Sequence, residues 1–132
     1  MSNGWRTVFL LSGAGNLANA LWMLAAPYHW YMNLPAAVPD FGPYNEHFVR
    51  DIGCTFATLG VLLLSAAAVP SMGLPALATA TLFSGMHALV HVYDTARGFV
   101  APAHWSIDLP GVYAPTILLL VLTWVWARRG AT

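Results

Sequence analysis

The sequence contains no lysine, a single cysteine and few charged residues, and each scarcity excludes a class of function. Retinal-type and other Schiff-base chemistry needs a lysine amine, so these mechanisms are excluded. The single cysteine, Cys54, cannot form an intramolecular disulfide or a CxxC redox or zinc motif. The five arginines balance five acidic residues, so the net charge gives no indication of a nucleic acid partner.

Hydrophobic residues make up 58% of the 132 residues, whereas charged residues make up 8%. Soluble domains carry about 25% charged residues, so the environment of most of this chain is lipid. A helix needs about 20 apolar residues to cross a bilayer, and four such runs use almost the whole length. They cover residues 5–26, 45–69, 72–98 and 107–127. The sequence therefore predicts a single all-α domain over residues 1–132, an integral membrane four-helix bundle.

The first apolar run has some features of a secretory signal peptide. Arg6 precedes it, and a triplet of small residues, Ala18, Asn19 and Ala20, resembles a cleavage site. The run nevertheless continues without interruption to Ala26, beyond the triplet. We therefore expect the first span to be retained in the protein.

The arginines predict the orientation of the spans. Arg6, Arg128 and Arg129 flank one side, whereas only Arg50 and Arg97 lie at the other. Because arginine is enriched in cytoplasmic segments, we expect both termini in the cytoplasm. All the histidines and acidic residues then fall toward the external side: His29, Asp40, Glu46, His47, Asp51, His87, His91, Asp94, His104 and Asp108.

Polar residues form a stripe on each of the two central spans. Both stripes use helical spacing: His87, His91 and Asp94 on the third span, and His47, Asp51 and Cys54 on the second. The connection over residues 69–73 is so short that these spans are predicted to be antiparallel neighbours. We therefore expect the two stripes to lie at the same depth and to converge.

Converging imidazoles and carboxylates predict a metal site, because these groups are the ordinary ligands of zinc, iron and copper. The candidate ligands are His47, His87 and His91, and Asp51 or Asp94 is the candidate base of a metalloenzyme that acts on a lipophilic substrate. Further polar side chains are candidates for holding or orienting the bound group: Asn16, Asn19, Glu46, Arg50, Arg97 and Asp108. No pattern in the sequence selects a reaction.

Three other interpretations remain open. In the first, the protein is a non-catalytic accessory subunit in which Asp51 and Asp94 pair with Arg50 and Arg97. In the second, His47 and a histidine of the third span hold a b-type haem, or the site binds a quinone. In the third, the cluster serves proton-coupled transport, for which a chain of this size would have to oligomerise.

The remaining histidines and the partners complete these expectations. His29 and His104 are expected to be interfacial loop residues, and His104 is the better placed of the two to fold over the cavity.

The expected partner is the lipid bilayer. A lipophilic small molecule, a second copy of the chain and a larger membrane complex are further candidates.

The segment over residues 45–53 follows a first span that ends at a proline, and it carries Asn45, Glu46, Arg50 and Gly53. This pattern resembles the opening of the second span in small bacterial four-helix membrane proteins of the DoxX-like kind. The resemblance covers the first two spans and implies a four-helix fold in a bacterial inner membrane. The histidine stripes lie outside the pattern, so the resemblance implies no function for them.

Overall fold

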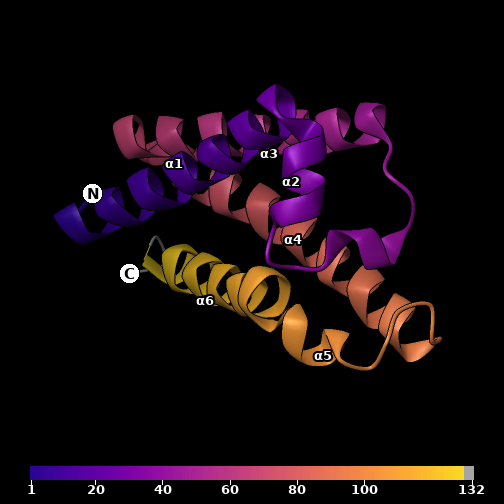
Figure 1. The fold of residues 1–132 in the computed structure, drawn as a ribbon. Helices are drawn as coiled ribbons and strands as arrows, with labels where there is room; N and C mark the ends of the chain where they lie inside the picture. The colour runs from indigo at the N-terminus through magenta and orange to yellow at the C-terminus, as the bar shows by residue number, and fades with distance from the viewer. Residues whose placement is uncertain (130–132) are drawn as a thin grey trace.

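The structure is a computed structural model that describes residues 1–129, and it is helical almost throughout (Figure 1). Four long elements are apolar enough to cross a membrane: α1 (Asn3–Ala25), α3 (Glu46–Ala68), α4 (Gly73–Ala96) and α6 (Ala114–Arg129), which continues the π-helical turn η3 (Leu109–Tyr113). No strand occurs within residues 1–129. The predicted all-α four-helix bundle is confirmed, and each predicted span overlaps one of these helices over nearly its whole length.

Helices α1 and α3 form one closely packed antiparallel pair. A Cβ atom on Gly60 of α3 would lie 2.7 Å from Leu17 Cγ and 3.0 Å from the carbonyl oxygen of Gly13 on α1. Farther along the same pair, a Cβ atom on Gly53 would lie 3.0 Å from Met23 Cβ. Small residues let helix backbones approach closely in a membrane. Helix α3 therefore packs against α1 at both of these positions.

Helices α4 and α6 form the second pair. The hydroxyls of Thr81 and Thr123 lie 2.7 Å apart, and the Thr116 hydroxyl donates to the carbonyl oxygen of Ser84 at 3.1 Å. Such bonds between helices satisfy polar groups that lipid cannot. Toward the termini, the ring of Trp126 fills the space over Gly73.

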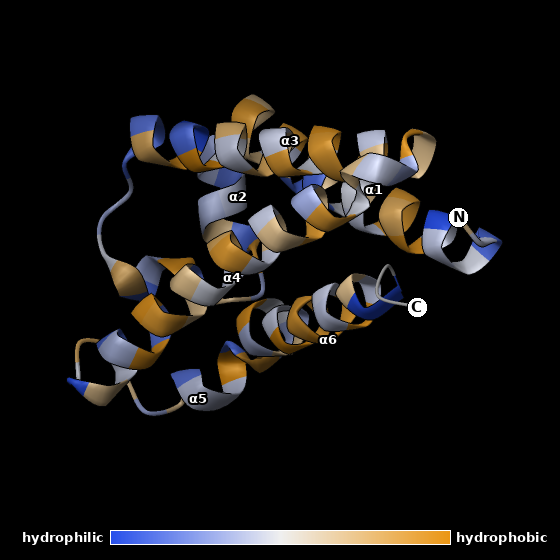
Figure 2. Cartoon of the chain, turned by 180° about the vertical axis from the view of Figure 1, so that it is seen from behind, coloured by the Kyte–Doolittle hydropathy of each residue, from blue (hydrophilic) through white to orange (hydrophobic). Residues whose placement is uncertain are grey.

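The two pairs join at the end of the molecule where both termini lie (Figure 1). A buried core forms there from α1, α3 and α4 and includes Phe9, Leu63 and Leu77. The short turn η2 (Pro70–Met72) connects α3 to α4, and from it the two helices diverge toward the opposite end in both views (Figures 1 and 2). We call this opposite end, which carries the long connections, the loop end.

The connection between α1 and α3 is more ordered than an irregular loop. It contains α2 (Pro27–Asn33) and the short helical turn η1 (Val38–Phe41). The Trp30 indole donates to Asn19 Oδ1 at 2.9 Å, and the Tyr31 hydroxyl donates to the carbonyl oxygen of Gly42 at 2.7 Å. The first bond fixes α2 on α1, and the second joins α2 to the residue that follows η1.

The fourth span is irregular where it leaves the loop end. The short helix α5 (His104–Ile107) leads through Asp108 into the π-helical turn η3, and α6 then begins one residue before Pro115. Proline has no N–H to donate to the carbonyl four residues earlier, which favours a wider turn at this point. The irregular turn places Asp108 at the loop end of the bundle.

Hydrophobic residues occur along all four long helices (Figure 2), and many of their large apolar side chains are exposed. The strongly exposed ones include Leu11, Leu21, Val61, Leu82, Leu89, Ile117 and Leu118. Contiguous apolar surface of this extent belongs in lipid rather than in water. The chain is therefore a multi-pass membrane protein.

Candidate functional site

Two aspartates and two histidines form one hydrogen-bonded network at the loop end. His91 Nδ1 lies 2.8 Å from Asp108 Oδ2, and His104 Nδ1 lies 3.3 Å from Asp108 Oδ1. The other ring nitrogen of His104, Nε2, lies 3.1 Å from Asp40 Oδ2. We call Asp40, His104, Asp108 and His91 the acid–imidazole network.

Three separate segments supply these side chains. His104 and Asp108 are four residues apart and lie on one face of the turn that contains α5, whereas His91 comes from α4. Asp40 comes from η1, which is bracketed by backbone in the left-handed region at Ala37 (φ 47°) and by Gly42 (φ 136°). The two loop-end connections are therefore tied together through the network.

Phe41 closes the network from the side of η1. Its ring centroid lies 4.7 Å from that of His91 and 4.8 Å from that of His104, in edge-to-face geometry with both. The side chains of His104 and Asp108 are fully buried, that of His91 is 12% exposed and that of Asp40 is 55% exposed. The network therefore runs from an exposed carboxylate to a buried one and then into α4.

The buried carboxylate of Asp108 is stable only because both of its oxygens have imidazole partners. An unpaired carboxylate in such surroundings would cost several kcal/mol. Burial lowers the pKa of His104, but the hydrogen bonds to Asp40 and Asp108 outweigh burial and raise this pKa above its ordinary value of 6.5. Since both nitrogens of His104 face carboxylate oxygens, the imidazolium form satisfies both contacts by donating twice.

The network continues to a second histidine within α4. The rings of His91 and His87 are 4.6 Å apart between centroids, in edge-to-face geometry. His87 stacks parallel to Phe83 at 6.1 Å, and Phe83 packs edge-on against Phe56 of α3. His87 is exposed at the surface of the described chain, beside the Phe83 ring that contacts α3. Because Asp108 engages Nδ1 of His91, Nε2 of His91 is the nitrogen left to interact elsewhere.

The predicted stripe on α3 does not meet the stripe on α4. His47 and Asp51 pair with each other at 3.3 Å on the surface, where their side chains are 83% and 57% exposed. Cys54 is exposed as well. The glycine contacts hold α3 against α1, so α3 diverges from α4 toward the loop end (Figure 1). Across residues 1–129, no group of three or more histidine, cysteine, aspartate or glutamate side chains is placed to hold a metal ion.

The structure does not bring the expected ligand set and catalytic pair together. His87 and His91 lie together as expected, but His47 is on another surface and does not complete their shell. A haem held between His47 and a histidine of α4 would also need His47 to lie near α4, and it does not. Asp51 is held by His47 instead of facing the α4 histidines.

One of the two ion pairs expected for an accessory subunit is present. Arg50 pairs with Glu46 at 2.9 Å on α3 and not with Asp51. Asp94 pairs with Arg97 at 2.8 Å, and the guanidinium of Arg97 also lies over the rings of Tyr93 and Phe99. The carboxylate of Asp94 is therefore paired with Arg97 at the end of α4.

The asparagines of α1 support the fold rather than the network. Asn16 donates to the carbonyl oxygen of Ser12 in its own helix at 2.8 Å. Asn19 accepts from Trp30 and contacts the sulfur of Met23 at 3.7 Å. Both residues stabilise α1 and the α2 segment.

Asp40 and His104 are functional candidates that sequence reasoning underestimated. The spacing of His104 and Asp108, four residues apart just before the fourth span, is a local signal that predicts a pair. The contact between Asp40 and His104 joins positions 64 residues apart, and no local pattern encodes it. His29, the other loop histidine, accepts a hydrogen bond from the Trp22 indole at 3.0 Å, as suits an interfacial residue.

Two buried hydroxyls adjoin the network. Thr95 follows His91 by one helical turn, and the backbone N–H of Tyr113 donates to the carbonyl oxygen of Asp108. Thr95 Oγ1 and Tyr113 Oη are both buried, and the two hydroxyls lie close enough to interact with each other.

Comparison of the chain with protein-family models, with curated proteins and with solved structures finds no match. The resemblance of residues 45–53 to DoxX-like proteins therefore stays a prediction.

Proposed function

We propose that this membrane protein transfers protons between the aqueous surface at the loop end and the imidazoles of His91 and His87 within the bilayer, for acid–base chemistry on a lipophilic molecule. One observation carries the proposal. The fully buried Asp108 bridges His91 and His104, and His104 continues to the exposed Asp40. Alternating acids and bases at hydrogen-bond distance are the arrangement that proton transfer requires.

The placement of ionisable residues favours delivery to a point within the membrane over transport across it. The sequence has no histidine or acidic residue between Asp51 and His87, and none after Asp108. The half of each span that is nearer the termini therefore has no histidine or acidic side chain to which the relay could pass a proton. A proton that reaches His87 meets the apolar interior, where a membrane-dissolved substrate is the natural partner.

The proposed orientation follows from the arginines at the termini. With both termini in the cytoplasm of a bacterial inner membrane, Asp40 faces the external aqueous phase. The relay then exchanges protons with the external side. The base that contacts substrate in this proposal is the imidazole of His87 or His91.

A direct test measures how fast the ring N–H protons of His87 and His91 exchange with water. The protein is labelled isotopically at histidine, placed in lipid nanodiscs and followed by nitrogen NMR. Asp108→Asn and Asp40→Asn should each slow exchange at both rings by about tenfold or more, because each breaks one step of the relay. Asp51→Asn, which removes an exposed carboxylate outside the network, should leave the rates unchanged. Unchanged exchange in both network variants would show that protons reach the rings by another route.

A second function, metal binding, is favoured by the contact between Asp108 and His91. A carboxylate on one ring nitrogen orients the other toward a metal, and His87 is the adjacent imidazole. Zinc, iron or copper held in this way would need ligands from outside the described residues, such as a second copy or a substrate. Titration of the same labelled protein with zinc tests this function. A shift of both rings at stoichiometric zinc would support it, and unshifted rings would contradict it.

A further inference from the structure

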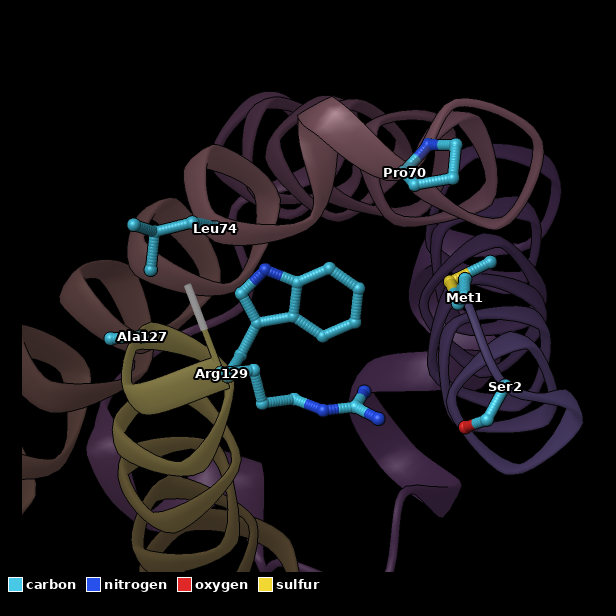
Figure 3. Close-up of a pocket in the computed structure, with 7 residues that line it drawn as sticks. Met1, Ser2, Pro70, Leu74, Ala127 and Arg129 are labelled. Atoms are coloured by element: carbon cyan, nitrogen blue, oxygen red, sulfur yellow. The ribbon is translucent and has the colours of Figure 1, made fainter. Parts of the chain in front are cut away.

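A cavity lies at the opposite end of the molecule from the acid–imidazole network. It has a volume of about 520 Å³ and opens between the start of α1, the turn η2, the start of α4 and the end of α6 (Figure 3). Its lining includes Met1, Ser2, Pro70, Leu74, Trp126 and Arg129. The walls are thus mostly apolar, with one cationic side chain.

Arg129 supplies the charge in this cavity. Its side chain extends across the opening toward Met1 and Ser2 (Figure 3), and the guanidinium carbon lies 5.3 Å from the ring centroid of Trp5 and 5.7 Å from that of Trp126. The aromatic rings hold the guanidinium in place while its N–H groups stay available to an anion. Every aspartate and glutamate of the sequence lies between positions 40 and 108, so no acidic side chain at this end of the described residues pairs with Arg129.

The occupant that matches these features has an anionic head and an apolar tail. Arginine binds phosphate through paired N–H donors, and Leu74 and Trp126 offer apolar surface beside it. We propose that the cavity binds an anionic phospholipid, with its phosphate on Arg129 and an acyl chain against Leu74 and Trp126. Further positive charge at this end, from Arg6 and Arg128, favours anionic lipids over zwitterionic ones. The proposal is independent of the proton relay.

The test is native mass spectrometry of the protein released from mixed micelles that contain equal amounts of phosphatidylglycerol and phosphatidylcholine. The wild type should retain phosphatidylglycerol preferentially. Arg129→Gln should reduce this retention by about fivefold, the contribution of one basic residue near an anionic surface. Arg128→Gln is the matched control, because its guanidinium lies 4.1 Å from Trp124, which does not line the cavity, and it should reduce retention less.

Two further arms test the acyl chain and the phosphate separately. Leu74→Trp fills the apolar wall without changing the charge, so it should also reduce phosphatidylglycerol retention. Inorganic phosphate at millimolar concentration should not displace the lipid, because it lacks the acyl chain. Equal retention of both lipids by the wild type, or equal losses in the two arginine variants, would overturn the proposal. Displacement by free phosphate would overturn the role of the acyl chain and show that the site recognises the anion alone. Thermal unfolding in detergent confirms that each variant is folded.

Discussion

His104 and Asp40 lie 64 residues apart in the sequence, yet Nε2 of His104 is 3.1 Å from Oδ2 of Asp40. The contact joins the two loop-end connections, one between α1 and α3 and the other between α4 and α6. It links the helix pairs at the end where α3 and α4 have diverged. The same contact is the surface step of the proposed relay, so it serves both the fold and the function.

Asp108→Asn should destabilise the protein by about 3 kcal/mol, because it removes the buried carboxylate that the imidazoles of His104 and His91 share. Asp51→Asn is the control and should change stability by about 0.5 kcal/mol or less, because Asp51 is exposed and pairs only with its own helix. Unfolding in mild detergent, followed by tryptophan fluorescence, measures both changes. Equal stability of the two variants would contradict the assigned role of Asp108.

Stability should fall as the pH rises above 6.5. The pKa of His104 is raised in the folded protein by Asp40 and Asp108, so its protonation stabilises the fold fully below the pKa of the unfolded state. This stabilisation is lost as the pH rises through the raised folded pKa. Melting temperatures between pH 6 and pH 9 measure the loss. In His104→Gln the decline should be shallower, and an unchanged decline would assign it to other groups.

The four spans could be predicted from the sequence because their lengths and apolar composition match the thickness of a bilayer. Which helices pair closely was harder to predict. The short turn η2 makes α3 and α4 neighbours in sequence, but the contact of Gly13 with Gly60 selects α1 as the main partner of α3. That contact depends on three-dimensional shape, and it is the reason that the His47 stripe points away from α4.

The candidate site could be predicted only where its residues share one helix. The spacing of His87 and His91 correctly placed their rings together. Asp108, a candidate orienting residue, lies 2.8 Å from His91 Nδ1. Asp40 and Phe41 entered the site because η1 folds back over α4, and bonds such as that between Tyr31 and Gly42 shape this loop. No periodic pattern in the sequence predicts such contacts.

Gly60→Val should destabilise the pair of α1 and α3 by about 2 kcal/mol, because the added side chain would meet Leu17 and the backbone of Gly13. Gly85→Ala is a suitable control, since a Cβ atom at Gly85 has no described neighbour within 4 Å. This control should be neutral or should stabilise α4 slightly through helix propensity. The same unfolding assay compares the two variants. If Gly60→Val were tolerated as well as Gly85→Ala, the close approach of α1 and α3 would be wrong.

The proposed orientation predicts which cysteines a membrane-impermeant maleimide can label in intact cells. In a Cys54→Ser background, Ala101→Cys at the loop end should be labelled, because it lies on the same connection as His104. Ser71→Cys in η2 should be labelled only after the membrane is made permeable, because it lies at the end with the termini arginines. The reverse result would place Asp40 and the entrance of the relay in the cytoplasm, and the proton exchanged with the substrate would then come from that side.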